Sequence, residues 1–500
     1  MSWSRRRLLG AGTLGLAGLA GPRAVRAAPF GAAPDATGAG LLLGDGVRAE
    51  QVLEVFLFGG LSPWETFYTV PEFGRPDDPD YPNEQYHLFG SGIAAIQERC
   101  ELSSDWLEPE PFATDADGQL VHLGPLVGPL RDRPDILARM RIVVQHHTLE
   151  PHEAAVPLML TGLRLGSPRM AGGATSVQRY FASLDGRTTP RAYTLYPEFQ
   201  IETANMRAAS AVGLHPALAR PLELRVGSTN NIPAMLARSG DAAQQAQLDG
   251  LVDLYAQRTA RRYSGLRAPA IGDHAAASAL FQDVEGLSAL LTEEAMANRT
   301  GTSCGIEDHS MPATSLAIAR HLLTHPTDPA RMVTFVDGGI KPSSGGGAYD
   351  VHTDHIGDTA TNLTHTLRLL TEMVNEPGEN DPTKVDLDRT MVALTTEFGR
   401  TPFVQRGSGN GTNHHPYGYV SVLIGGPIGP DQAGVVGSIG PDGTARTYVT
   451  PVELRAAMLA GMGIWPFAHE SFTVGDLRLP SRPEVDGLAW LHEIVLGRPA

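Results

Sequence analysis

Five short runs of apolar residues, rich in β-branched and aromatic side chains, constrain most strongly what this chain can fold into. Each run is mostly apolar at both alternating positions, and each leads into Gly, Pro, His or another polar stretch. Such runs are typical of strands buried on both faces of a mainly parallel sheet that helices cover. The five runs are "VLEVFLF" (52–58), "RIVVQ" (141–145), "MVTFV" (332–336), "TMVALTT" (390–396) and "YVSVLIG" (419–425).

The segments between these runs favour an α/β fold. Leu363, Leu367, Leu370 and Val374 recur at helical spacing between the third and fourth runs, which predicts a strand–helix–strand unit with both strand ends at one edge. Helical patterns also occupy "LARPLEL", "MLARSGDAAQQAQLDGLVDLYAQRTARRY" and "ALFQDVEGLSALLTEEAMAN". We therefore expect one α/β domain over residues 29–500, a mainly parallel sheet flanked by helices, with a helical insertion at about 205–325.

The N-terminus resembles a twin-arginine export signal. "SRRRLLGAGTLGLAGLAG" combines arginines with a glycine-diluted apolar stretch, and "AVRA" supplies small residues for cleavage near Ala27 and Ala28. The apolar stretch is too short for a membrane-spanning helix, and none is expected elsewhere. Residues 1–28 are thus predicted to be a signal peptide read by the twin-arginine translocase, with a periplasmic or secreted destination. Its loss removes five arginines and changes the formal charge from −16 to −21.

Composition excludes several classes of function. The acidic balance argues against a nucleic-acid partner. Lysine occurs only at Lys341 and Lys384, which disfavours Schiff-base chemistry, and no G-x-x-x-x-G-K-[ST] loop is present. Cys100 and Cys304 could form a disulfide after export, but the sequence leaves their pairing open.

Polar residues gather where the five predicted strands meet one edge of the sheet. Ligands of open α/β sheets bind beyond the carboxyl ends of the strands. The residues delivered there are Ser62, Glu65 and Thr66 after the first run, His146, His147 and His152 after the second, "DGGIKPSSGGGAYDVHTDH" after the third, Glu397 and Arg400 after the fourth, and His414 and His415 before the fifth. A solvated loop explains any one of these segments, but five together favour a single site.

"YDVHTDH" (349–355) is the densest of these segments. It carries Asp350, His352, Asp354 and His355, and carboxylate and neutral imidazole are ligands of zinc, manganese and iron. Alternatives stay open for each piece. In the alternative interpretation, "YDVHTDH" is a polar loop, and the histidines at 146–147 and 414–415 bind backbone or form a turn. Glu397 is then a salt-bridge partner of Arg400.

In order and spacing, several motifs resemble the exported DUF1501 proteins, a family of unknown function. The matching stretches, from about residue 50 to 470, are "FLFGGLSPWETF", "HEAAVPLMLTG" with "LGSPRM", "YDVHTDH", "TTEFGRTP", "NHHPYGYVSVLIGGPI" with "GVVGS", and "PVELRAAMLAGMGI". That family is similar in fold to the alkaline phosphatase and sulfatase superfamily. The resemblance implies an alkaline-phosphatase-like domain and a divalent metal ion (zinc, manganese or calcium).

The superfamily also implies roles for individual residues. By position, the metal ligands would be Asp350, His352 or His355, Glu397, and His414 or His415. The nucleophile would be Ser62 or Thr66, and Arg400 would bind the substrate anion. Two departures favour one metal over two: "FGG" stands where many members have an Asp after the first strand, and Glu397-Phe398 stands where they have Asp-His.

The expected function is therefore hydrolysis of a phosphate or sulfate ester, on a small molecule or a polysaccharide, with a metal as Lewis acid. One alternative is an exported, non-catalytic protein that binds an anionic or polysaccharide ligand on the same fold. A serine hydrolase is another, because "GTSCG" (301–305) fits G-x-S-x-G around Ser303. That motif needs a preceding strand and a following helix, and the sequence before it reads as helical.

Overall fold

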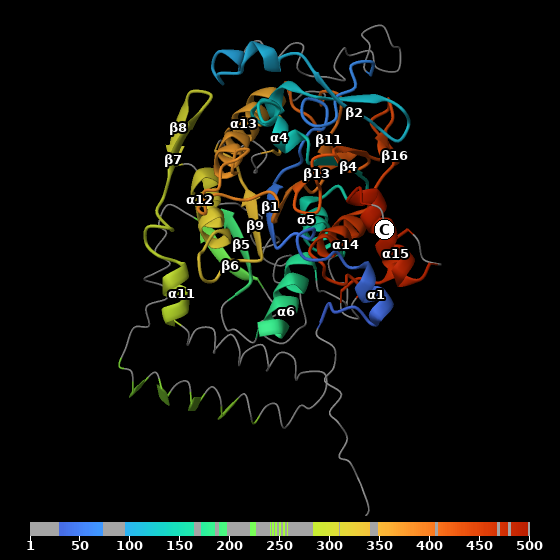
Figure 1. Cartoon of the computed structure of the whole chain (residues 1–500). Coiled ribbons are helices and arrows are strands. Elements are labelled where there is room, and N and C mark those ends of the chain that lie inside the picture. Colours follow the sequence, from blue (N-terminus) through green and yellow to red (C-terminus); the bar gives the residue numbers. More distant parts are fainter. Residues whose placement is uncertain are drawn as a thin grey trace, which may run out of the picture.

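The structure is a computed structural model (Figure 1), and it describes most of the chain. The described residues are 30–73, 96–164, 172–185, 190–197, 221–226, scattered positions between 241 and 258, 284–309, 311–340, 349–405, 409–467, 471–478 and 482–498. The predicted signal peptide, most of the predicted helix at 235–263 and the glycine run at 343–347 lie outside them. No helix within the described ranges has the length and apolar character that crossing a membrane requires.

A large central sheet organises the fold. Within the described residues it has eight strands in the order β14-β4-β13-β10-β1-β9-β5-β6. Its strands are β1 (Gln51–Leu57), β4 (Met140–Gln145), β5 (Ala192–Pro197), β6 (Leu222–Val226), β9 (Met332–Asp337), β10 (Thr390–Thr395), β13 (Tyr419–Gly425) and β14 (Gly434–Val436). β13 is antiparallel to both neighbours, and the other pairs are parallel. All five predicted strands, and the mainly parallel sheet, are confirmed.

Both faces of the sheet are buried, as the sequence of β1 requires. Leu53, Val55 and Leu57 point into one apolar core, while Val52 and Phe56 point into the other. Each fully buried side chain of this size stabilises the fold by roughly 1.5–3 kcal/mol. A strand apolar at every position is stable only between two helical layers.

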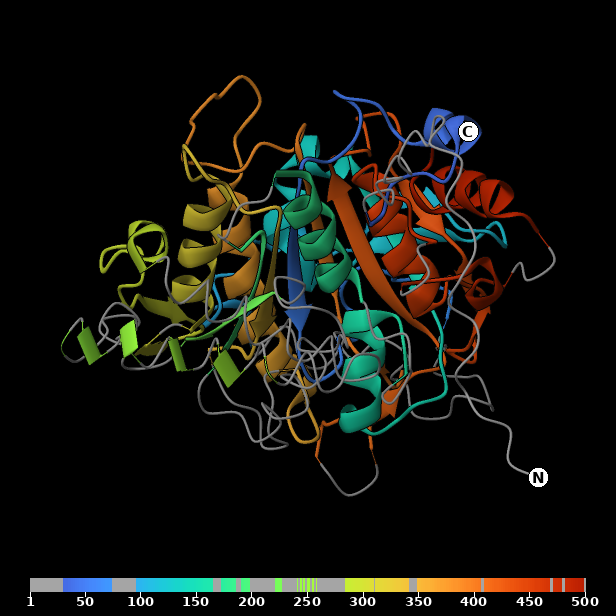
Figure 2. The same ribbon diagram turned by 90° about the horizontal axis from the view of Figure 1, so that it is seen from below.

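Two sets of helices form those layers (Figures 1 and 2). α12, α13 and α3 contribute to the first core, and α5, α6, α14 and α15 to the second. The helices are α1 (Ala36–Leu41), α3 (Gly128–Arg131), α4 (Pro134–Leu137), α5 (His152–Thr161), α6 (Gly173–Asp185), α11 (Val284–Leu290), α12 (Met311–Leu323), α13 (His355–Met373), α14 (Pro451–Gly461) and α15 (Glu484–Trp490), with short turns η1 (Ser104–Trp106), η2 (Pro125–Val127), η3 (Val474–Asp476) and η4 (Leu491–Val495). α13 is the helix predicted from the leucine spacing.

The region expected to be a helical insertion also contains strands. Leu222–Leu224 of "LARPLEL" belong to β6, the edge strand of the central sheet, so the helical interpretation of these residues is wrong. Pairing with β5 outweighs helix propensity in this short segment. α11 confirms part of "ALFQDVEGLSALLTEEAMAN" as helical.

In the part of the chain that the structure describes, four two-stranded ribbons lie outside the central sheet. They are β2 (Glu110–Thr114) with β3 (Leu120–Leu123), β7 (Thr300–Ser303) with β8 (Ile306–His309), β11 (Gly399–Arg400) with β12 (His414–His415), and β15 (Ser438–Ile439) with β16 (Ala445–Thr447).

The β7–β8 hairpin accounts for two sequence features. Cys304 at its turn forms a disulfide with Cys100, which the sequence had left open. Ser303 precedes a turn and a second strand rather than a helix, and its hydroxyl donates to the carbonyl of Thr361. The strand–turn–helix geometry of a serine-hydrolase nucleophile is therefore not present at "GTSCG".

The strand directions bring the predicted polar segments to one edge. Phe56 of β1 lies opposite Val336 of β9 and Thr395 of β10, each near the carboxyl end of its strand. Tyr419, which begins the antiparallel β13, lies opposite Gln145, which ends β4. The segments that follow β1, β4, β9 and β10 therefore leave the sheet where the segment before β13 enters it.

Candidate metal centre

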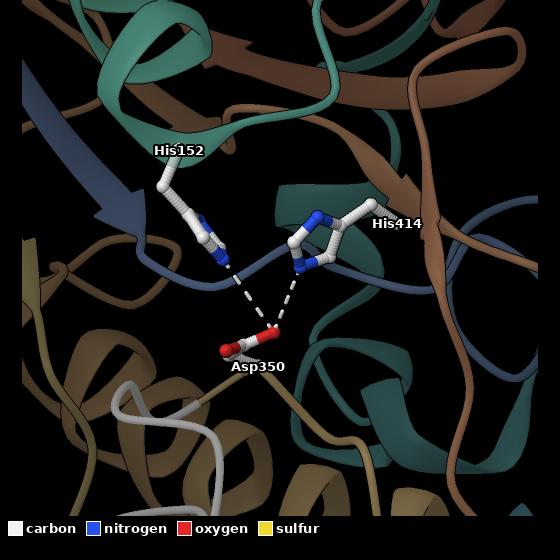
Figure 3. A group of neighbouring side chains, drawn as sticks. All are labelled: His152, Asp350 and His414. Carbon is white, nitrogen blue, oxygen red and sulfur yellow. Dashed lines mark hydrogen bonds and ion pairs between the residues drawn. The ribbon is translucent and has the colours of Figure 1, made fainter.

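Three side chains from distant segments converge at this edge (Figure 3). His152 begins α5, Asp350 lies in the loop before α13, and His414 lies in β12. One ligand atom from each lies within 4.8 Å of the others, and Asp350 Oδ1 lies 3.5 Å from His152 Nε2 and 3.1 Å from His414 Nε2. The figure shows the two imidazoles directed at the same carboxylate from different sides. These residues form the candidate metal centre.

Glu397 orients His152. Glu397 Oε1 accepts a hydrogen bond from the backbone N–H of Gly59 (2.7 Å) and one from His152 Nδ1 (2.8 Å). The Nδ1 atom therefore carries the hydrogen, and Nε2 faces Asp350 Oδ1 at 3.5 Å. Nε2 is buried and makes no hydrogen bond within the described residues. A carboxylate on one imidazole nitrogen, with the other nitrogen free, is the usual surrounding of a metal-ligating histidine.

His414 has the same arrangement. Its Nδ1 lies 3.0 Å from the carbonyl oxygen of Glu150, which can only accept, so Nδ1 carries the hydrogen. Its Nε2 lies 3.1 Å from Asp350 Oδ1, and Phe398 stacks on the ring with centroids 4.4 Å apart. Two neutral imidazoles of this tautomer would direct lone pairs at one carboxylate oxygen. A proton or a metal ion must lie between them.

The pKa values of these residues indicate where a proton lies between the imidazoles and Asp350 when no metal is bound. Burial opposes a charge on His152, but the neighbouring carboxylates of Asp350 and Glu397 raise its pKa to about 10. Burial lowers the pKa of His414 and outweighs its hydrogen bond to Asp350. Burial would raise the pKa of Asp350, but three imidazoles and a guanidinium hold it well below its usual range. In the metal-free chain, a proton on His152 therefore occupies the place of a cation.

His352 lies on the open side of the site. Its Nε2 is 2.9 Å from Asp350 Oδ1 and 3.3 Å from His414 Nε2. Its side chain is 28% exposed, against 6% for Asp350 and 22% for His414. The centre is thus closed on the side of His152 and reached from solvent past His352 and His414.

Gly59 explains the missing aspartate after the first strand. Its φ is +114°, and a Cβ atom there would lie 2.1 Å from the backbone nitrogen of Asp350. No side chain fits, because the loop that carries Asp350 occupies the space. The backbone of Gly59 instead binds Glu397 through its N–H and Arg400 through its carbonyl.

Arg400 is enclosed by the protein. Its Nη1 donates to Asp350 Oδ1 (3.0 Å) and to the carbonyl of Gly59 (3.2 Å), its Nε donates to Thr412 Oγ1 (3.2 Å), and its Nη2 donates to the carbonyl of Thr412. The side chain is fully buried. Each guanidinium nitrogen thus has a protein acceptor, and the residue fixes the orientation of Asp350.

The segment that carries Thr412 supports the loop that carries Asp350. Asn410 and Thr412 donate backbone hydrogen bonds to the carbonyls of Thr353 and Val351. A Cβ atom on Gly411 would lie 1.8 Å from the carbonyl oxygen of His352. The two backbones touch here, so these described residues of the glycine-rich stretch 407–411 are tied to the loop of Asp350.

Three of the predicted site residues lie in a second, buried cluster. Ser62 Oγ donates to Glu65 Oε2 (2.5 Å), and Thr66 Oγ1 donates to the carbonyl of Ser62 (2.5 Å). His355 Nε2 lies 3.1 Å from Glu65 Oε2, and its Nδ1 lies 2.9 Å from Thr412 Oγ1. Asp354, the second carboxylate of "YDVHTDH", caps α13.

His415 points away from the centre. Successive side chains of a strand face opposite sides, so His414 faces Asp350 while His415 Nε2 donates to the carbonyl of Gly443 (2.8 Å). Burial lowers the pKa of His415. His146 and His147 bind the carbonyls of Tyr417 and Glu397, which is the backbone role considered from sequence.

The sequence identified His152 as an edge residue but did not select it as a ligand. A usable signal was its place, because it follows a buried strand and starts the next helix on the same edge. The donor set of two imidazoles and one carboxylate fits zinc, manganese or iron. It fits calcium poorly, since calcium is bound by oxygen ligands.

Comparison with known proteins shows the family. The chain matches the model of the family described as "Protein of unknown function (DUF1501)" over residues 49–479, and it belongs to this family. The match covers every residue of the candidate centre. A search of curated proteins found no match to the chain.

Proposed function

We propose that this DUF1501 protein is an exported, metal-dependent hydrolase of phosphate or sulfate esters, with one divalent ion held by His152, Asp350 and His414. The observation that carries the proposal is the pair of imidazoles with Nδ1 bound to acceptors and Nε2 directed at one carboxylate oxygen. His352 is the nearest further nitrogen and a candidate fourth ligand.

The charges of the two buried clusters support a divalent ion. Glu65, Asp350 and Glu397 are buried carboxylates, and Arg400 is the buried arginine among them. Taken as ionised, they leave a formal charge of about −2, and buried charge is costly unless compensated. A divalent cation compensates it, whereas the proton on His152 compensates only half.

The chemistry follows from what surrounds the ion. A bound divalent ion supplies Lewis-acid activation of water and of a phosphoryl or sulfuryl oxygen. Glu397 and the carbonyl of Glu150 orient the two imidazoles, and Arg400 orients Asp350. The substrate approaches on the side of His352, because the opposite side is closed by α5.

Water is the nucleophile in this proposal. Ser62 and Thr66 were the sequence candidates, but both are buried, and their hydroxyls donate to Glu65 and to the carbonyl of Ser62. Neither hydroxyl is directed to solvent, so an ester would not reach them without a rearrangement of this segment.

Export by the twin-arginine pathway to the periplasm or beyond is part of the proposal. The arginine-rich N-terminus supports it, and a disulfide between Cys100 and Cys304 is compatible with an oxidising compartment. The alkaline-phosphatase-like topology predicted from the resemblance also belongs here. The parallel sheet with its site at the carboxyl edge supports it.

A non-catalytic binding protein is the second candidate, and one observation favours it. Each guanidinium nitrogen of Arg400, the arginine at the centre, already donates to an acceptor in the protein. An ester anion would then be bound by the ion and by exposed imidazole alone. In this alternative the metal binds a polysaccharide or anionic ligand without turnover.

An ester panel separates the two candidates. The folded protein is stripped with a chelator, reloaded with zinc or manganese, and assayed on aryl phosphates, aryl sulfates and a sulfated polysaccharide. We expect metal-dependent release of phosphate or sulfate, lost in His152→Ala and His414→Ala and kept in the neighbouring His415→Ala. Metal binding without turnover of any ester would support the binding protein. The absence of both metal binding and turnover would refute both candidate functions.

A further inference from the structure

We propose that Glu65, His355 and Thr412 are positioning residues that hold Arg400, and through it Asp350, in the orientation the metal centre needs. Their effect on catalysis rests on the proposed function. This assigns a role to the buried cluster that also holds Ser62 and Thr66, the candidate nucleophiles from sequence, and in which His355 was a candidate ligand.

A continuous chain of hydrogen bonds joins the two clusters. Arg400 Nε lies 3.2 Å from Thr412 Oγ1, which lies 2.9 Å from His355 Nδ1. His355 Nε2 lies 3.1 Å from Glu65 Oε2. At the other end of the chain, Arg400 Nη1 lies 3.0 Å from Asp350 Oδ1.

The donor is determined at both ends of this chain. A guanidinium only donates, so Thr412 Oγ1 accepts from Arg400 Nε. At the other end, His355 Nε2–H donates to the carboxylate of Glu65. The Thr412 hydroxyl and His355 Nδ1 form the hydrogen bond between these two ends.

Burial makes the chain rigid and excludes a direct chemical role. Glu65, His355, Thr412 and Arg400 have exposures of 0%. Buried polar groups cost free energy when a partner is lost, so each bond in the chain constrains the next. None of the first three can touch a substrate, which is why they are positioning residues.

The arrangement matters because Arg400 has few other constraints at Nε. Its Nη1 and Nη2 bind the backbone carbonyls of Gly59 and Thr412, whereas within the described residues its Nε–H donates to the Thr412 hydroxyl alone. Loss of the Thr412 hydroxyl would leave a guanidinium Nε–H and a His355 nitrogen without partners. Rotation of the guanidinium then relieves one of them and shifts Asp350.

Thr412→Val and Thr412→Ser are the matched test, since valine keeps the shape and serine keeps the hydroxyl. In crystal structures of the metal-free variants, we expect the distance from Arg400 Nη1 to Asp350 Oδ1 to exceed about 3.5 Å in Thr412→Val and to stay hydrogen-bonded in Thr412→Ser. Zinc affinity, measured by competition with a chelator, should fall about 10- to 100-fold in the valine variant and recover in the serine variant.

Glu65→Gln is the second variant, because it removes the charge and keeps the size. It should weaken zinc binding in the same direction, because an amide oxygen is a weaker acceptor than the carboxylate that holds His355 Nε2. An unchanged Arg400–Asp350 contact in Thr412→Val overturns the positioning role, whatever the metal results are. If the wild-type chain binds no zinc or manganese, the proposed function fails, while the crystallographic distance still decides the positioning role.

Discussion

Two of the buried carboxylate–arginine pairs among the described residues are built differently. Glu54, in β1, pairs with Arg455 of α14; its oxygens also accept from Thr395 (2.7 Å) and Thr334 (3.2 Å), and Arg455 Nε donates to the carbonyl of Met159. Asp350 pairs with Arg400, but three imidazole nitrogens crowd around the same oxygen. Both acids are almost fully buried.

The surroundings of the two carboxylates distinguish a structural ion pair from a candidate metal site. Glu54 and Arg455 bind each other and nearby hydroxyl and carbonyl groups, so their charges are compensated inside the fold. Around Asp350, three imidazole nitrogens share one carboxylate oxygen. His152 Nε2 is buried without a hydrogen bond within the described residues, and the group is open to solvent on one side. Such a group is stable in one arrangement only when a proton or cation completes it.

The largest expected effect is on the structural pair. Arg455→Met leaves Glu54 buried without its cation, and we expect a loss of about 3–5 kcal/mol in the free energy of unfolding. Urea denaturation, with and without chelator, measures it. A loss below about 1 kcal/mol, the usual value of an exposed pair, would contradict the assignment of Glu54 and Arg455 as a structural ion pair.

The next effect is on the metal centre. Metal at a concentration 100 times its dissociation constant stabilises the native chain by about 2.7 kcal/mol if it binds only that state. We expect chelation to lower the melting temperature of the wild type and of His415→Ala. His152→Ala and His414→Ala should show no such shift, and a chelator shift that persists in both would place the ion elsewhere.

A smaller effect distinguishes an orienting carboxylate from a ligand. Glu397 contacts His152 Nδ1 rather than the converging atoms, so Glu397→Gln should weaken zinc binding by about 10- to 100-fold without abolishing it. Isothermal titration measures the affinity. Complete loss of binding in Glu397→Gln would make Glu397 a ligand, as the resemblance implied.

The pH dependence is the smallest effect and has a definite sign. His152, with a pKa of about 10, carries a proton at neutral pH in the metal-free chain, and the metal must displace it. Manganese affinity should therefore rise about tenfold per pH unit between about pH 7 and 9. The metal-free chain should lose stability over the same range, because the folded pKa of His152 lies above the unfolded value of about 6.5.

The pH dependences of manganese affinity and of stability both depend on the proton of His152, and a variant of this residue checks them. His152→Ala has no such proton to lose, so its unfolding free energy should lack this downward slope. Manganese affinity that stays constant from pH 7 to 9 in the wild type would mean that His152 is neutral before the metal binds.

Much of the fold was predictable from local pattern. β1, β4, β9, β10 and β13 are continuous apolar runs, and a buried strand needs little else. β6 was not, because the pattern of "LARPLEL" fits a helix, and only its place beside β5 makes it a strand. Such a long-range pairing leaves no trace in these seven residues.

The site was predictable as a place but not as a ligand set. The carboxyl edge and Asp350 follow from strand direction and composition. The choice of His414 over His415 depends on strand pairing with Gly399 and Arg400, which sets the facing of β12. The choice of His152 over Glu397 depends on which atom each presents, and that becomes visible only in three dimensions.

The most direct test of the central claim is a crystal structure of the metal-loaded protein, with anomalous diffraction at the zinc or manganese edge. We expect one strong peak at about 2.0–2.2 Å from the Nε2 atoms of His152 and His414 and from an oxygen of Asp350. An anomalous peak bound by other residues, or no peak at this carboxylate in crystals grown with excess metal, would contradict it.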